Sequence, residues 1–147
     1  MIRFRDFITE QRDIRILDGN ELAKIIHSSR KNDNVFQRLK YLHPTEIHRE
    51  IHIIELDDDK IIGSVALQEN PYDKKQVWFK HVTVDNKYRN KGIARALIER
   101  AFEFVSKHPK YSSISISSFS DEGESKLKPL FKKLETKYQN ITVRYTS

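Results

Sequence analysis

The sequence predicts an α+β domain of three layers (α/β/α), in which a mixed, mostly antiparallel sheet has helices on both faces. Three observations carry this prediction. Residues 51–56 and 61–67 are β-branched runs joined by a short acidic turn, which is typical of a hairpin. Residues 76–84 form a longer strand that runs into a glycine and an amphipathic helix. Two later strands, 111–117 and 141–145, flank a further helical stripe, and strands mixed with helices in this order indicate one covered sheet.

The predicted domain covers residues 13–147, and residues 1–12 form an N-terminal extension. The full length of 147 residues suits one domain with a single core. In the extension, Phe4 and Phe7 fit one turn of helix, whereas Ile2 and Phe4 fit an edge strand. The N-terminus lacks the apolar centre of a secretory signal, so we expect a cytoplasmic or otherwise intracellular protein.

The first ten residues also resemble the short N-terminal targeting segments of proteins packaged inside the heads of large tailed bacteriophages. In those proteins a protease cuts after an (Ile/Leu)-x-Glu sequence, and Ile8-Thr9-Glu10 fits this pattern. The alternative is an ordinary amphipathic tail, because short motifs often match by chance.

Residues 14–17 predict the first strand, which ends at Asp18 and Gly19. Asp18 and Glu21 then have the spacing of a capping box, which opens a helix. The apolar residues that follow repeat at helical spacing: Leu22, Ile25 and Ile26.

Prolines mark the limits of the other predicted helices. A second short helix over 35–42 is stopped by Pro44, and the helix over 92–106 is closed by Pro109. Pro129 lies inside the last helical stripe, so that helix either starts there or is kinked there. The apolar positions of this stripe are Leu127, Leu130, Phe131, Leu134 and Tyr138.

The stretch from Val82 to Ile98 is a strand, a polar turn and a glycine that opens a helix. Such a helix start leaves backbone N–H groups without intrahelical partners at the positive end of the helix dipole, which favours a phosphate group. Arg89, Lys91 and Arg95 add positive charge there. The spacing matches neither the P-loop nor the G-x-G-x-x-G dinucleotide pattern.

The segment Arg89-x-x-Gly92-x-Ala94, preceded by Val-x-Val and Tyr88, resembles the R/Q-x-x-G-x-G/A motif of the GNAT superfamily of N-acetyltransferases. The predicted order of strands and helices is also that of the GNAT fold, so the resemblance covers about residues 13–147. It implies an acyltransferase that moves an acetyl group from acetyl-CoA to an amine of a protein or small molecule, by direct transfer in a ternary complex. The cofactor-binding residues that it implies are Val82, Thr83, Val84, Arg89, Asn90, Lys91, Gly92, Ile93 and Ala94.

In this family the strand before the motif splays from its neighbour at a bulge, and its exposed backbone pairs with the pantetheine arm. By position, that segment is Val82 to Val84. A backbone N–H here would also polarise the thioester carbonyl. The alternative is a plain central strand.

Transfer to an amine requires a neutral amine, and a free lysine amine has a pKa of about 10.4. A general base is therefore expected near the splay. His81 is the best candidate, since an imidazole ordinarily titrates at about pH 6.5. A partly buried structural histidine is the alternative, and Glu69 and Asp121 are poorer candidates at the ends of neighbouring strands.

The departing thiolate must be reprotonated, and many family members use a tyrosine in the last helix for this. Phe131 stands at that position here, and Glu124 replaces the asparagine of the family pattern. Three alternatives remain: solvent supplies the proton, Tyr138 or Tyr145 does, or the protein binds the cofactor without efficient turnover. Tyr138 is two helical turns from Phe131, roughly 10 Å, which favours a packing role for it.

Composition limits the other classes of function. The formal net charge of +6 fits solvated lysines, a polyanionic ligand such as coenzyme A, or a nucleic-acid partner, although no nucleic-acid-binding motif is present. The absence of cysteine excludes disulfides, thiolate zinc sites and a cysteine nucleophile. His48, Glu50 and His52 alternate on one strand face, but without an H-E-x-x-H motif we predict no metal site. No apolar run approaches the ~20 residues that span a bilayer.

The sequence leaves rival functions open and does not identify the acceptor amine. A GNAT-fold protein that binds coenzyme A or a partner without catalysis is the main rival, and a basic adaptor contacting nucleic acid is another. The lysines of the last helix are expected on its solvent-exposed face, where one or two of them could contact the 3′-phosphate of coenzyme A.

Overall fold

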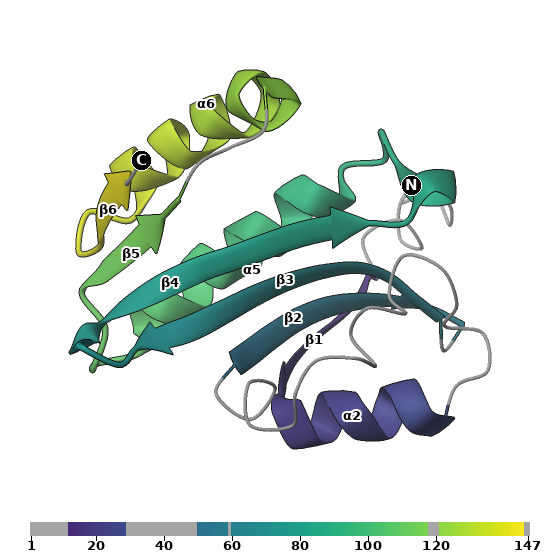
Figure 1. Ribbon diagram of the computed structural model, residues 1–147. Coiled ribbons are helices and arrows are strands. Elements are labelled where there is room, and N and C mark those ends of the chain that lie inside the picture. The colour runs from purple at the N-terminus through teal and green to yellow at the C-terminus, as the bar shows by residue number, and fades with distance from the viewer. Residues whose placement is uncertain (1–11, 29–49, 59, 118–120, 146–147) are drawn as a thin grey trace, which may run out of the picture.

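A computed structural model describes residues 12–28, 50–58, 60–117 and 121–145 (Figure 1). These residues form one six-stranded sheet whose strands follow one another in sequence order. The strands are β1 (Asp13–Asp18), β2 (Glu50–Asp57), β3 (Lys60–Asn70), β4 (Asp73–Val84), β5 (Ser113–Ile116) and β6 (Thr142–Tyr145). The pairs from β1 to β4 are antiparallel, whereas β5 runs parallel to both β4 and β6. The predicted mixed, mostly antiparallel sheet is therefore confirmed.

The described helices cover both faces of this sheet. They are α2 (Gly19–Ser28), the 3₁₀ helix η2 (Asn86–Tyr88), α5 (Ile93–Lys107) and α6 (Asp121–Lys137). Figure 1 shows α2 and α5 on opposite sides of the sheet, with α6 beside β5 and β6. The capping box at the start of α2 is confirmed, because the Glu21 N–H donates to Asp18 Oδ1 at 2.8 Å and the Asp18 N–H donates to Glu21 Oε1 at 3.2 Å.

Two hydrophobic clusters correspond to the two faces. The larger lies between the sheet, α5 and α6, and its fully buried side chains include Leu97, Phe102 and Phe131. The smaller lies under α2 and consists of Leu17, Leu22, Ile54, Leu56 and Ile61. Adjacent β2 residues Ile53 and Ile54 enter different clusters, as the alternation of a strand with both faces covered requires.

Most predicted elements are present, with changed limits. The hairpin and the long strand extend by several residues, and α6 begins at Asp121, so Pro129 lies inside this helix rather than at its start. Tyr138 follows the last residue of α6 instead of lying within it. The predicted helix over 35–42 and the predicted extension up to residue 11 lie outside the described residues. None of the described helices has the length and apolarity needed to cross a membrane.

Candidate functional site

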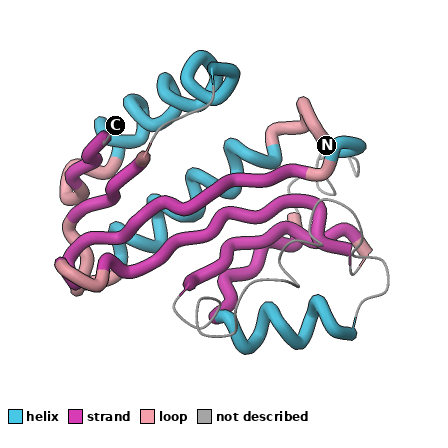
Figure 2. The backbone as a smooth tube through the Cα atoms, in the orientation of Figure 1, coloured by secondary structure: helices cyan, strands magenta, loops and turns pink. Residues whose placement is uncertain are grey.

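The second half of β4 has a neighbour on one side only. Pairing with β5 ends at Phe79↔Ile116, while pairing with β3 continues to Gly63↔Val84. In the described part of the chain, no strand covers the other edge of β4 from Lys80 to Val84. Figure 2 shows β5 running beside only the first part of β4. The splay that the resemblance implies is thus present.

A bulge in the pairing of β4 with β3 marks the place where β4 and β5 separate. Ala66 pairs with His81 and Leu67 pairs with Phe79, so Lys80 is an extra residue on β4. Because side chains alternate along a strand, one extra residue shifts the alternation. Val77 and Phe79 before the bulge and Val82 and Val84 after it therefore all contact the larger cluster.

The turn after β4 is fixed by hydrogen bonds to its own backbone and to β2. Asp85 is buried and accepts a hydrogen bond from the Lys87 N–H at 3.0 Å, with Lys60 Nζ at 3.4 Å. These contacts, the Lys87 N–H first, hold the pKa of the Asp85 carboxyl below its ordinary value. The Tyr88 hydroxyl donates to Asp57 Oδ2 at 2.6 Å, and this hydrogen bond raises the pKa of Tyr88.

The second part of the turn is joined to β2 through Arg12, the residue that precedes β1. Its guanidinium donates to the Lys91 carbonyl oxygen at 2.9 Å and to Glu55 Oε1 at 3.1 Å. Glu55 is buried, with 9% of its side chain exposed, so Arg12 compensates a carboxylate held away from water. Sequence reasoning placed Arg12 in the extension and missed this contact, which joins residues 79 positions apart.

The start of α5 has the backbone geometry of an anion site. Asn90 and Gly92 have φ of 63° and 75°, in the left-handed region that favours glycine. Gly92 caps α5 without a side-chain hydrogen bond, and the Ala96 N–H donates to the Gly92 carbonyl at 3.0 Å. The N–H groups of Ile93, Ala94 and Arg95 therefore have no intrahelical acceptor.

Gly63 of β3 sets the distance between α5 and the sheet. A Cβ at this position would lie 2.6 Å from Ile93 Cγ2 and 2.9 Å from Leu97 Cδ1. The absence of a side chain thus lets the first turns of α5 lie close against β3. This packing places the start of α5 beside Val84, the β4 partner of Gly63.

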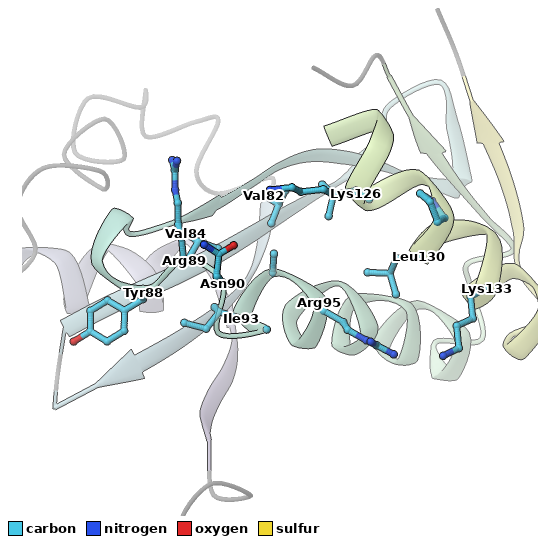
Figure 3. A pocket seen from close by; sticks show the side chains of 14 residues that line it. Val82, Val84, Tyr88, Arg89, Asn90, Ile93, Arg95, Lys126, Leu130 and Lys133 are labelled. Atoms are coloured by element: carbon cyan, nitrogen blue, oxygen red, sulfur yellow. The ribbon is translucent and has the colours of Figure 1, made fainter. Parts of the chain in front are cut away.

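A cavity of about 700 Å³ joins the bare edge of β4 to the start of α5. Figure 3 shows Val82 and Val84 on β4, Ile93 and Arg95 on α5, and Leu130 on α6 around this space. Its lining residues come from three places: β4 and the turn (Val82, Val84, Tyr88, Arg89, Asn90), the start of α5 (Gly92, Ile93, Ala94, Arg95) and α6 (Lys126, Leu127, Pro129, Leu130, Lys133).

Positive charge surrounds the cavity. Its lining includes Arg89, Arg95, Lys126 and Lys133, and none of the lining residues that the structure describes is Asp or Glu. Arg95 contacts Glu99 at 3.3 Å on the surface of α5, a pair that solvent screens. An anion at the start of α5 would therefore meet both the helix dipole and these cations.

The structure brings seven of the nine predicted cofactor residues to this cavity: Val82, Val84, Arg89, Asn90, Gly92, Ile93 and Ala94. Thr83 pairs with Ser64 and alternates to the opposite face. Lys91 contributes its carbonyl to Arg12, and its Nζ lies 5.4 Å from the centre of the Tyr88 ring. The sequence allowed one or two lysines of the last helix to contact the cofactor, and Lys126 and Lys133 line the cavity, whereas the apolar contribution of α6 was not predicted.

The candidate bases occupy different places. His81 is half-buried directly after the bulge, and pairs with Ala66 on the face opposite Val82. Glu69 binds Lys110 Nζ at 2.9 Å and accepts from the Tyr111 hydroxyl at 3.1 Å; the Lys110 contact is the main reason that the Glu69 pKa is lowered. Asp121 is the first residue of α6, and its side chain is outside the described set.

Neither the two candidate proton donors, Tyr138 and Tyr145, nor Phe131 is among the described residues that line the cavity. Phe131 is fully buried, with its ring edge-on to Phe79 at 5.3 Å between centroids. Tyr138 packs against Phe102 at 6.3 Å between centroids. Tyr145 on β6 lies under Lys132 Nζ at 4.7 Å, and burial raises the pKa of its hydroxyl to about 12.

Of the three alternating residues that were weighed against a metal site, the structure describes two. His52 Nε2 lies 3.2 Å from Glu50 Oε2, and both side chains are buried on β2. His48 is outside the described residues. Among those that are described, no group of three His, Cys, Asp or Glu side chains is arranged to hold a metal ion.

Comparison with known proteins agrees with this geometry. Residues 20–133 match the model of the acetyltransferase (GNAT) family. Among solved structures, an aminoglycoside acetyltransferase from an uncultured soil metagenomic sample aligns with a TM-score of 0.58 and 19% identity, over 84% of this chain and 90% of the other. A spermidine N-acetyltransferase chimera from Vibrio cholerae aligns with a TM-score of 0.56 and 25% identity, over 84% and 79%.

A ribosomal-protein-alanine N-acetyltransferase from Escherichia coli aligns with a TM-score of 0.59 and 15% identity, over 84% of this chain and 76% of the other. No curated protein sequence matches the chain significantly. The family model covers most of the chain, and the fold of the solved structures agrees with it. The chain therefore belongs to the GNAT family of acetyltransferases.

Proposed function

We propose that this protein transfers the acetyl group of acetyl-CoA to an amine, by direct transfer in a ternary complex. The observation that carries the proposal is the single cavity that joins an anion site at the start of α5 to the bare edge of β4. A ligand with a polyanionic end and an amide-containing arm fits such a cavity, and coenzyme A has both parts.

The chain's own groups would bind the two parts differently. Amides of the pantetheine arm would pair with the backbone of β4 between Lys80 and Val84, as an added strand pairs with a sheet edge. The pyrophosphate would accept hydrogen bonds from the backbone at the start of α5. Arg89 and Lys133 lie on opposite sides of the cavity and would offset its charge (Figure 3).

The transfer requires one proton to leave the amine and one to reach the sulfur. The amine nitrogen forms a bond to the acetyl carbonyl carbon, the carbon–sulfur bond breaks, and the thiolate leaves. A backbone N–H of β4 would stabilise the oxyanion, and His81 would accept the amine proton. Because His81 lies on the face opposite Val82, the acceptor would approach from that face.

We propose that solvent returns the proton to the thiolate. Phe131 has no hydroxyl, and a tyrosine with a pKa of about 12, as in Tyr145, is a weak proton donor. Tyr138 is the alternative donor. A Tyr138→Phe variant with unchanged kcat supports solvent, whereas a loss of 100-fold or more would assign the role to Tyr138.

Isothermal titration with acetyl-CoA, followed by release of free thiol in the presence of an amine panel, tests the proposal. The panel contains an aminoglycoside, spermidine and a peptide with an N-terminal alanine, after the names of the structural neighbours. Micromolar binding and thiol release with at least one amine are expected. No binding at millimolar acetyl-CoA would refute the proposal.

A second candidate is a protein that binds coenzyme A without useful turnover. The observation that favours it is Phe131, which places a core ring where the family pattern has a hydroxyl. Tight binding of acetyl-CoA together with no thiol release from any amine would support this candidate over the first.

A further inference from the structure

We propose that Arg12 is a positioning residue that orients the Lys91–Gly92 peptide, so that the Gly92 N–H points at the bound phosphate. This inference rests on the proposed function, because it concerns the pyrophosphate of that cofactor. It assigns a role in the cofactor site to a residue that does not line the cavity.

The geometry of the guanidinium supports this role. One terminal nitrogen donates to the Lys91 carbonyl oxygen at 2.9 Å, and the other donates to Glu55 at 3.1 Å. The planar fork of an arginine makes both bonds at once, and the buried carboxylate holds the fork in place. Glu55 belongs to β2 and pairs with Gly63 of β3, which in turn pairs with Val84 of β4.

The contacts of Arg12 fix the directions in which the C=O and the N–H of the Lys91–Gly92 peptide point. Arg12 holds the Lys91 oxygen on the side of β2, whereas the cavity lies on the side of β4 and α6. The C=O and N–H of one planar trans peptide point in opposite directions. The N–H of Gly92 therefore points toward the cavity, in line with the unpaired N–H groups of the first turn of α5.

The orientation of the Lys91–Gly92 peptide has to be fixed by another group, because glycine by itself allows the peptide to flip. Rotation of the Lys91–Gly92 peptide by about half a turn changes only Lys91 ψ and Gly92 φ, and glycine accepts either sign of φ. After such a rotation the carbonyl oxygen would face the phosphates, which repel it. The αL geometry observed at Gly92, with φ of 75°, is the state in which Arg12 holds the carbonyl away.

The test compares full-length wild type with Arg12→Gln, using ADP and pantetheine as separate probes of the two parts of the cofactor. Chemical-shift titration of protein labelled with ¹⁵N-glycine is suitable, because the chain has only four glycines. We expect Arg12→Gln to weaken ADP binding about tenfold, as loss of one charge-assisted hydrogen bond would. Pantetheine affinity should be unchanged, and the ADP-induced shift of the Gly92 amide should shrink.

Arg15→Gln is the matched control, since Arg15 is an exposed arginine of β1 that pairs with Asp13 on the surface. It should bind both probes as wild type does. Unchanged ADP affinity in Arg12→Gln overturns the inference, and so does an equal loss for both probes with a lower Tm, which indicates a merely structural role. If the wild-type protein bound neither ADP nor pantetheine, the proposed function itself would be refuted.

Discussion

The two halves of β4 show how one strand serves both the core and the site. From Gln76 to Phe79 the strand is paired on both sides, and Val77 and Phe79 are buried. From Lys80 to Val84 only β3 is paired, and the side chains are half-buried or exposed. Both halves carry strand-forming side chains, aromatic at Trp78 and Phe79 in the first half and β-branched from Val82 to Val84 in the second. What separates their pairing is the neighbour, because β5 accompanies only the first half.

This contrast separates residues whose change should lower stability from residues whose change should lower activity or binding. The first half stabilises the fold through burial, and the second half exposes backbone that a ligand is proposed to pair with. The following experiments test this separation, in order of decreasing expected effect.

The largest effect is expected at His81, the first residue after the bulge. As the proposed base, it should lose about 100-fold or more in kcat when changed to Gln, because general base catalysis typically contributes that much. Steady-state kinetics with saturating acetyl-CoA measure this. His108→Gln, at the far end of α5, should retain full activity. Equal kcat values for wild type and His81→Gln would remove His81 from the mechanism.

Gly92→Glu is expected to weaken acetyl-CoA binding by about 100-fold. A residue with a side chain would be strained by roughly 1 kcal/mol in the αL conformation that Gly92 adopts. The carboxylate would also put a negative charge at the proposed anion site. Its Cβ would lie 3.7 Å from Arg12 Nη2, so the protein itself has room for it. Titration calorimetry gives the affinity, and Gly92→Ala separates conformation from charge. A Gly92→Glu protein that binds as wild type does would contradict the assignment of the anion site.

The same substitution in each half of β4 gives a direct comparison. Val77→Ala should lower the free energy of unfolding by about 2 kcal/mol, because two methyl groups leave a buried position, and should leave acetyl-CoA affinity unchanged. Val84→Ala should cost about 1 kcal/mol or less and weaken binding several-fold, since Val84 lines the cavity. Urea unfolding and calorimetry measure both quantities. The reverse pattern would show that the halves do not differ as proposed.

The smallest effect is expected from Asp85→Asn, which removes the charge that caps the turn. The pKa of Asp85 is lowered in the folded protein, so its carboxylate stabilises the fold at pH values above its unfolded pKa of about 3.9. That contribution is lost as pH falls through the lower folded pKa. The variant should therefore be less stable by about 0.5–1 kcal/mol at pH 7, and this difference in stability should shrink as the pH falls below the unfolded pKa. A difference that widens as pH falls, in urea unfolding, would reverse the assigned sign.

Local sequence patterns predicted the elements well, and they located the candidate anion site at the start of α5. The β-branched runs on either side of residues 57–60, the capping box at Asp18 and the glycine at 92 each depend on neighbours in sequence, and the structure has the corresponding elements. Seven of the predicted cofactor residues reach one cavity because they belong to one continuous strand, turn and helix.

Long-range contacts were not predictable in the same way. The bulge depends on the register between β3 and β4, and Arg12 depends on a meeting with Lys91 that no local pattern encodes. The helix α6 continues through Pro129 because packing of the whole helix outweighs one lost hydrogen bond. Its contribution to the cavity follows from that tertiary position.

The bulge at Lys80 also has a consequence for insertions and deletions. A strand that is covered on both faces assigns its residues alternately to the two sides, and Lys80 is the one residue that changes the assignment midway. Deleting Lys80 alone would remove the bulge, keep the other pairs between β3 and β4, and leave Val82 and Val84 facing α5. A single missing codon at this position would thus preserve the two faces of the strand and remove only the local bend that the bulge gives it.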